Sequence, residues 1–244
     1  MNCQCIFKRY ELKYLITKKQ QLLIKEAMVP FMQEDQYGQS SISNIYFDTP
    51  SYLLIRRSLE SPIYKEKLRM RSYGTAQPDS RVFVELKKKY QAIVYKRRTP
   101  MTEKEAVKYL LFGSPAPGNG QIIQEINYFQ QLYRPLIPAM FISYQREAFF
   151  GKADPNFRIT FDEEILWRQN DLSLCVEPYG DPLLEKEQVL MELKTSGAIP
   201  LWMTRLLTEN RIYKTSFSKY GNAYKTQLLK GVGCYVGSTI SRAV

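Results

Sequence analysis

The stretch YKEKLRMRSYG, residues 64–74, carries a cation at every second position. If these residues form a β-strand, the four cations share one face: Lys65, Lys67, Arg69 and Arg71. Like charges aligned on one strand face repel each other, so this face needs an anionic partner. Arginine binds phosphate through planar bidentate contacts and lysine binds it as a point charge. The stretch is therefore suited to holding a phosphate-rich ligand.

Other strand-like segments also pair an apolar face with a charged face. The pattern Glu-x-Lys occurs three times, at Glu11/Lys13, Glu85/Lys87 and Glu192/Lys194. The same alternation places Tyr144 with Arg146, and Arg158 with Thr160, Asp162 and Glu164. An antiparallel sheet that buries one face and exposes the other explains any single strand. Two interpretations therefore stay open, a solvated sheet face and a charged cavity.

A closed barrel would turn these charged faces inward. Burying so many charges is costly unless the cavity is wet and holds a ligand of opposite charge. Carboxylates among such cations are suitable ligands for Mg²⁺ or Mn²⁺, because hard ions prefer oxygen donors. Cations for phosphate and carboxylates for metal are together suited to phosphoryl transfer.

The composition of the 244-residue chain narrows the possible chemistry. The net charge of +11 favours a polyanionic partner. The absence of histidine excludes histidine bases and every histidine-containing zinc motif. The four cysteines lack zinc-finger spacing and are too sparse for a disulfide scaffold, which favours a reducing compartment. With no apolar run of about 20 residues and no signal-peptide pattern, we expect a cytoplasmic protein without a transmembrane segment.

Strand patterns dominate the chain. We expect strands near residues 5–15, 42–47, 63–73, 81–89, 92–99, 139–149, 157–165 and 187–195, with a short one near 172–177. We expect helices at 18–29 after an N-cap at Thr17, at 103–111 after a Thr102/Glu105 capping box, and at 120–133, 200–209 and 218–230. About eight strands with short connections indicate an α+β fold whose antiparallel sheet could close into a barrel.

The segment SFSKYGNAY places Ser218 and Lys219 at the expected start of the last helix. Free backbone N–H groups at a helix N-terminus bind phosphate. A plain N-cap with a neighbouring lysine explains the pattern equally well. No Walker A sequence is present, so the chain is not a P-loop protein.

The ordered set of motifs resembles VTC domains, the polyphosphate polymerase domains of the vacuolar transporter chaperone complex and their bacterial relatives. The motifs run from about residue 6 to about 226: FKRYELKYLI, IYFDTP, YKEKLRMRSYG, VFVELKKK, ISYQREAF, ITFDEEI, LMELKT and SFSKYGNAY. VTC domains belong to the triphosphate tunnel metalloenzymes. The resemblance therefore implies an eight-stranded antiparallel β-barrel with a charged lumen and flanking helices. It implies a single domain over residues 1–244, in which the helix at about 218–230 closes or plugs the barrel.

The resemblance also implies roles for individual residues. The residues expected to line the tunnel and hold the triphosphate or polyphosphate are Lys13, Arg69, Arg71, Lys87, Arg146, Lys194 and Lys219. Further substrate contacts are expected from Arg56, Lys67, Lys96, Tyr144, Arg158 and Ser218. Glu192 is the expected principal ligand of Mn²⁺ or Mg²⁺, with Glu11 and Glu85 as helpers. One departure is that the superfamily motif E-x-E-x-K here reads Arg9, Glu11, Lys13, which weakens a multi-carboxylate metal site on the first strand.

Three functions follow from these observations. We expect a metal-dependent phosphotransferase that adds the terminal phosphoryl of ATP to polyphosphate. Hydrolysis of inorganic or nucleoside triphosphate in the same tunnel is the first alternative. A non-catalytic binder of polyphosphate, nucleotide or RNA is the second, for which the interleaved tyrosines would be suited: Tyr64, Tyr73, Tyr90 and Tyr95. Nucleic acid is the less favoured partner, because carboxylates among the cations weaken binding of a polyanion.

Overall fold

The computed structural model describes residues 10–91 and 93–239. Within these residues one ten-stranded antiparallel sheet runs in the order β10-β1-β9-β7-β6-β2-β3-β4-β5, with β8 paired to β7. The eight long strands are β1 (Tyr10–Thr17), β2 (Met32–Asp48), β3 (Tyr64–Tyr73), β4 (Arg81–Tyr90), β5 (Ile93–Thr102), β6 (Ile137–Gly151), β7 (Arg158–Arg168) and β9 (Gln188–Thr195). The two short ones are β8 (Asp181–Pro182) and β10 (Lys214–Thr215).

The helices of the described chain are α1 (Lys18–Met28), α2 (Leu53–Leu59), α3 (Glu103–Phe112), α4 (Gln121–Leu132), α5 (Leu201–Glu209) and α6 (Lys219–Thr239). The expected capping residues are confirmed. Thr17 and Thr102 each form a capping box, with Gln20 and Glu105 respectively. None of these helices is both long and apolar enough to cross a bilayer.

Several expectations about the elements need correction. The second strand begins ten residues earlier than expected, at Met32. Residues 172–177 form no strand, and the short strand of this region is β8. Glu164 was expected on the charged face. It lies at a register shift between β6 and β7, where its φ is +48° and its side chain is exposed, so it does not follow the strand alternation. The expected strand residues 5–9 and 92, and also Arg9, lie outside the described residues.

Helix α2 was missed because its cap is not adjacent to it in sequence. Tyr52, at the N-cap position, adopts a left-handed φ of 57° and makes no side-chain cap. Instead Asp48, at the end of β2, accepts hydrogen bonds from the N–H groups of Leu54 at 2.9 Å and Ile55 at 3.0 Å. This carboxylate satisfies N–H groups that the first turn of the helix leaves unpaired.

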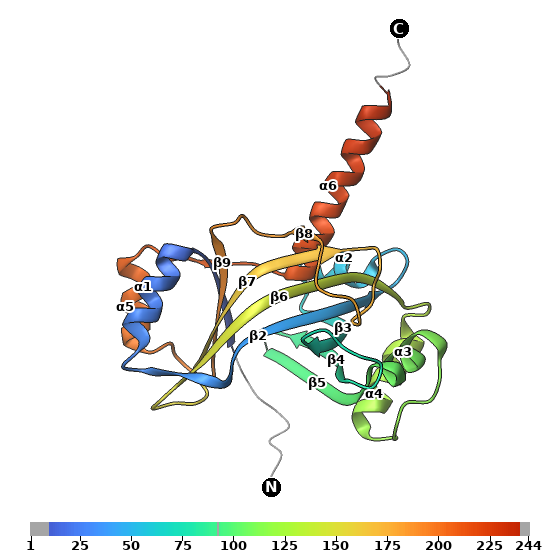
Figure 1. Cartoon of the computed structure of the whole chain (residues 1–244), viewed down its shortest axis with the longest axis horizontal. Helices are drawn as coiled ribbons and strands as arrows, with labels where there is room; N and C mark the ends of the chain where they lie inside the picture. The colour runs from blue at the N-terminus through green and yellow to red at the C-terminus, as the bar shows by residue number, and fades with distance from the viewer. Residues whose placement is uncertain (1–9, 92, 240–244) are drawn as a thin grey trace.

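The sheet curls until its two ends approach each other (Figure 1). Lys87 on β4 donates to Glu11 on β1 at 2.9 Å, although six strand pairings separate these strands. Among the described residues no backbone pairing joins β5 to β1 or β10, and the side-chain contact between Lys87 on β4 and Glu11 on β1 spans the gap. The expected α+β fold with an antiparallel barrel is therefore confirmed, with a seam that is not closed by backbone hydrogen bonds.

The apolar faces of the strands point outward, under the helices. Helices α1 and α5 lie together on one side of the sheet (Figure 1). They cover an apolar cluster that includes Ile24, Ile159 and Met203. Helices α3 and α4 lie at the opposite side and cover a second cluster that includes Val84 and Ile126. Because burial of these faces supplies the hydrophobic stabilisation, the charged faces are left to line the inside of the barrel.

A third apolar cluster brings α2 and the first turns of α6 against inward-facing strand residues. Tyr220 stacks on Tyr46 with ring centroids 4.8 Å apart, and Phe217 and Tyr224 belong to the same cluster. From there α6 extends away from the sheet (Figure 1). The start of α6 is therefore fixed to the inner side of the barrel, where its first polar side chains can reach the lumen.

Candidate active site in the barrel lumen

The strand register places opposite charges beside each other on the inner face. Glu11 and Lys13 on β1 lie opposite Lys194 and Glu192 on β9. Arg69 on β3 lies opposite Glu85 on β4, and Arg146 on β6 lies opposite Asp162 on β7. Because side chains alternate along a strand, these pairs bring the predicted cations and carboxylates to one concave surface.

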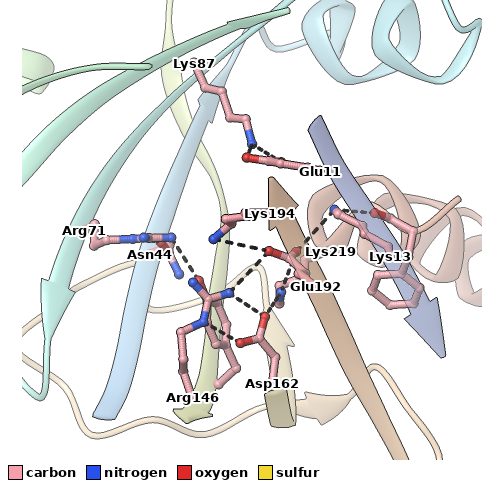
Figure 2. Close-up of polar contacts among 12 residues, drawn as sticks. Glu11, Lys13, Asn44, Arg71, Lys87, Arg146, Asp162, Glu192, Lys194 and Lys219 are labelled. Carbon is pink, nitrogen blue, oxygen red and sulfur yellow. Dashed lines mark hydrogen bonds and ion pairs between the residues drawn. The ribbon is translucent and has the colours of Figure 1, made fainter. Parts of the chain in front are cut away.

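Asp162 is the most deeply buried carboxylate of the site, with no exposed surface. Arg146 binds it through two parallel contacts of 2.5 and 2.6 Å, and Lys219 from α6 donates to the same carboxylate (Figure 2). Burial alone would raise the pKa of Asp162, but Arg146 and Lys219 hold it below its usual range. Asp162 therefore acts as a fixed counter-ion that orients two cations.

Glu192 lies at the centre of four cations, and none of them is close to it. Its Oε1 is 3.4 Å from Lys13 and 3.8 Å from Lys219, and its Oε2 is 3.7 Å from Arg146 and 3.8 Å from Lys194 (Figure 2). These cations hold its pKa well below its usual value although burial opposes them. A buried, ionised carboxylate with only long contacts can exchange them for a metal ion or a water molecule.

Glu85 organises a second group of cations. Arg69 contacts its Oε2 from two nitrogens, at 2.7 and 2.9 Å, and Lys96 lies 2.6 Å from Oε1. Arg71 lies 3.9 Å away. Both oxygens of Glu85 already bind cations, so its geometry favours orienting Arg69 and Lys96 over accepting a metal.

Arg71 and Tyr144 connect the two groups. Arg71 donates to Asn44 at 2.8 Å and to the Tyr144 hydroxyl at 2.9 Å. The Lys219 ammonium lies 4.4 Å from the centre of the Tyr144 ring. Burial alone would raise the pKa of Tyr144, but Arg71, Arg146 and Lys219 lower it to about 8. This hydroxyl is therefore an unusually acidic hydrogen-bond donor for a phosphate oxygen.

Lys67 is a cation without an anionic partner. Its ammonium donates to Ser218 Oγ at 2.9 Å, and no carboxylate within the described residues lies within 4.0 Å of it. Burial, together with the positive charges of Lys13 and Lys87, lowers the pKa of Lys67 to about 7. Ser218 in turn accepts the N–H of Gly221 at 3.1 Å, which makes it the cap of α6.

The lumen brings together most of the residues expected from the sequence. The expected cations and hydroxyls whose contacts place them there are Lys13, Lys67, Arg69, Arg71, Lys87, Lys96, Tyr144, Arg146, Lys194, Ser218 and Lys219. Arg158 lies on the same face, opposite Lys194, but its guanidinium pairs with Asp35 at 2.5 Å. Arg56 is exposed on α2.

Sequence reasoning placed Asp162 on the charged face but assigned it no role, and it overlooked Asn44. The alternation in ITFDEEI could have indicated Asp162, because it shares a face with Thr160 and Arg158. The role of Asn44 depends on pairing between β2 and β3, which places it opposite Arg71. No periodicity within a single strand reports that pairing.

The carboxylates of the lumen fit a metal ion only in part. The described residues contain no group of three or more acidic, cysteine or histidine side chains that could hold a metal by themselves. Glu192, with its long contacts, and Glu11 on the neighbouring strand supply oxygen donors of the kind that Mg²⁺ and Mn²⁺ prefer. The donor set therefore fits a metal ion that arrives with phosphate oxygens as its remaining ligands.

Comparisons with known proteins identify a family and a similar fold. The sequence model of one family, described as VTC domain, matches residues 8–228. A candidate adenylate cyclase from Bacillus halodurans has a similar fold, with a TM-score of 0.53 and 15% identity over 86% of this chain and 95% of that one. A candidate adenylyl cyclase from Hippeastrum, described as having a dominant triphosphatase activity, gives 0.51 and 15% over 87% and 93%. The comparison with curated proteins finds no significant match.

Proposed function

This chain belongs to the VTC-domain family, and we propose that it is a metal-dependent phosphotransferase that adds the terminal phosphoryl group of ATP to polyphosphate inside the barrel. The proposal depends most on one observation, the excess of cations over carboxylates on the inner face (Figure 2). A cavity with this excess of positive charge is stabilised by a polyanion, and a triphosphate supplies several negative oxygens.

In this reaction the protein would contribute positioning and charge neutralisation. Arginines held by Glu85 and Asp162 would keep their orientation while they bind phosphate oxygens, so little reorganisation is needed when the phosphoryl group moves. Lys219 and Ser218, at the N-terminus of α6, would bind the end of the phosphate chain. A divalent metal ion held by Glu192 would neutralise charge on the transferring phosphate.

Hydrolysis in the same lumen is the second candidate. Residues 217–219 are joined to three strands, since Lys13 donates to the Phe217 carbonyl at 2.6 Å, Lys67 donates to Ser218, and Lys219 binds Asp162. A segment joined to β1, β3 and β7 at once would limit how far a long polymer can pass through. The Hippeastrum neighbour is described as a triphosphatase, and water would then replace the acceptor phosphate.

Product analysis separates the two reactions. Purified protein is incubated with ATP, Mn²⁺ or Mg²⁺ and a short polyphosphate primer, and the products are resolved by chain length. The proposal predicts primers that lengthen as ADP accumulates. Release of orthophosphate without longer chains would support hydrolysis instead, and metal-independent binding without turnover would support a binding protein.

The same assay tests the assigned cations. Arg69→Ala and Lys194→Ala are expected to abolish turnover, because each removes a charge that faces the lumen. The matched control is Lys104→Ala, which removes an exposed lysine from α3 outside the barrel. Turnover that survives both lumen substitutions would contradict the proposed site.

A further inference from the structure

We propose that the barrel carries a nucleobase-binding subsite formed by Tyr73, Phe83 and Arg98. This subsite would bind the base of a nucleoside triphosphate whose phosphates occupy the lumen. The inference rests on the proposed function, because it assumes that the lumen binds triphosphates. It adds what that function leaves open, namely how the protein would distinguish a nucleotide from inorganic triphosphate.

All three residues occupy inward-facing register positions beside the phosphate-binding cations. Phe83 lies directly opposite Arg71, and Arg98 lies directly opposite Glu85. Tyr73 follows Arg71 by two residues on β3, a spacing of about 7 Å along a strand. A ligand whose phosphates contact Arg71 would therefore extend toward these residues.

The three side chains contact one another, and Phe83 lies half-buried between the exposed side chains of Arg98 and Tyr73. The Arg98 guanidinium carbon lies 4.9 Å from the centre of the Phe83 ring, and the Tyr73 and Phe83 rings meet edge to face with centroids 6.0 Å apart. Tyr73 is 51% exposed, and Arg98 is also exposed. Guanidinium and aromatic planes stack on nucleobases, because every base has a π-face.

Core packing does not account for this arrangement. The aromatic residues of the three apolar clusters are buried under helices or against α6, whereas half of the Tyr73 side chain is open to solvent. Tyr64 and Tyr90, at the other end of the same strand pair, lie on the outward-facing register. Tyr73 and Phe83 are thus aromatic residues of this strand pair that share the face of the cations.

Stacking would favour nucleoside triphosphates over inorganic triphosphate. Each stacked base contributes roughly 1–3 kcal/mol, which corresponds to about fivefold to 150-fold in binding. Inorganic triphosphate has no base and would gain nothing from these residues. The two substrates therefore provide an internal comparison within one protein.

The test measures, by calorimetry, the affinity of the same protein for ATP and for inorganic triphosphate. The variants are Tyr73→Ala and Phe83→Leu, which change no charge, together with Arg98→Ala. We expect the affinity for ATP to fall by about fivefold or more in each variant, while the affinity for inorganic triphosphate changes less than twofold in the two uncharged variants. Tyr90→Ala, at the other end of β4, is the matched control and should leave both values unchanged.

The outcomes separate the subsite from the proposed function. An unchanged ratio of the two affinities in Tyr73→Ala and Phe83→Leu, with inorganic triphosphate still bound, overturns the subsite alone. An equal fall for both substrates also overturns it, because the residues would then act on the lumen and not on the base. If the wild-type protein neither binds nor turns over either substrate, the proposed function and the subsite both fail.

Discussion

At the scale of single residues, the carboxylates of the lumen orient arginines and lysines that can still donate hydrogen bonds to a ligand. Asp162 and Glu85 each hold an arginine in a fixed direction through short contacts. Within the part of the chain that the structure describes, the cations lie 3.4–3.8 Å from Glu192, and Lys67 donates to a hydroxyl. The free protein thus has unsatisfied positive charge that a phosphate chain would neutralise.

This arrangement predicts that binding of triphosphate takes up protons. Burial and neighbouring charges lower the pKa of Lys67 to about 7 and that of Lys194 to about 8. An anion beside them favours the charged forms, so both pKa values rise in the complex and affinity falls as pH increases from 7 to 9. We expect a loss of about tenfold or more, since one pKa unit corresponds to about 1.4 kcal/mol. Calorimetry at each pH, in buffers of different ionisation enthalpy, measures the affinity and the proton uptake.

Lys67→Arg provides the control for this linkage. Arginine keeps its charge over the whole range, so the variant should take up fewer protons at pH 8 than the wild-type protein. Equal proton uptake by the two proteins would rule out Lys67 as the titrating group.

The sequence predicts those features of the candidate site that depend on alternation within a single strand. Alternation indicated which face holds Lys67, Arg69 and Arg71, and these residues do face the lumen. The partnership between Asn44 and Arg71 depends on which strands become neighbours. No local pattern reports this, because cross-strand partners are distant in sequence.

At the scale of elements, one buried carboxylate ties α2 and α6 to the sheet. Asp48 accepts hydrogen bonds from three backbone N–H groups and from the Tyr220 hydroxyl at 2.9 Å. Tyr220 immediately follows Lys219, which enters the lumen. Asp48 therefore fixes the start of α6 relative to the site. Whether this helix closes the barrel, as the family resemblance implies, stays a prediction.

Asp48→Ala is expected to lower the free energy of unfolding by about 2–4 kcal/mol. The substitution leaves buried N–H groups without partners, and hydrogen bonds to charged groups contribute about 1.5–3 kcal/mol each. Tyr220→Phe removes a single hydrogen bond and should have a smaller effect of about 1–3 kcal/mol. Urea denaturation measures both. Wild-type stability in Asp48→Ala would show that the carboxylate is not needed to hold these helices.

Most elements were predictable because their signals are local. The capping boxes at Thr17 and Thr102 and the strand alternation are read from neighbouring residues. Helix α2 was missed because its capping carboxylate lies at the end of the preceding strand. The prediction of a strand at 172–177 was wrong. Periodicity alone does not distinguish a short apolar strand from a loop whose apolar side chains are buried, as the side chain of Leu174 is.

At the scale of the whole molecule, a barrel with apolar outer faces and charged inner faces explains the high net charge of the chain. Helices cover the apolar outer faces of the sheet (Figure 1), and Glu11 on β1 contacts Lys87 on β4 across the lumen (Figure 2). The net charge of +11 is thus concentrated in part where a polyanion can bind. The sequence indicated an antiparallel sheet that could close. It did not indicate that β5 and β1 stay unpaired, because this depends on how far the whole sheet curls, and no local motif reports that.

The most direct test of the account is a calorimetric titration with inorganic triphosphate of the wild-type protein, Lys194→Met and Lys104→Ala. Among the described residues Lys194 forms one ion pair, a long contact of 3.8 Å with Glu192, so its loss should leave the fold intact. The account predicts one site in the wild-type protein, binding weakened about tenfold or more in Lys194→Met, and wild-type affinity in Lys104→Ala. Equal affinity in all three proteins would contradict the claim that the lumen binds the triphosphate.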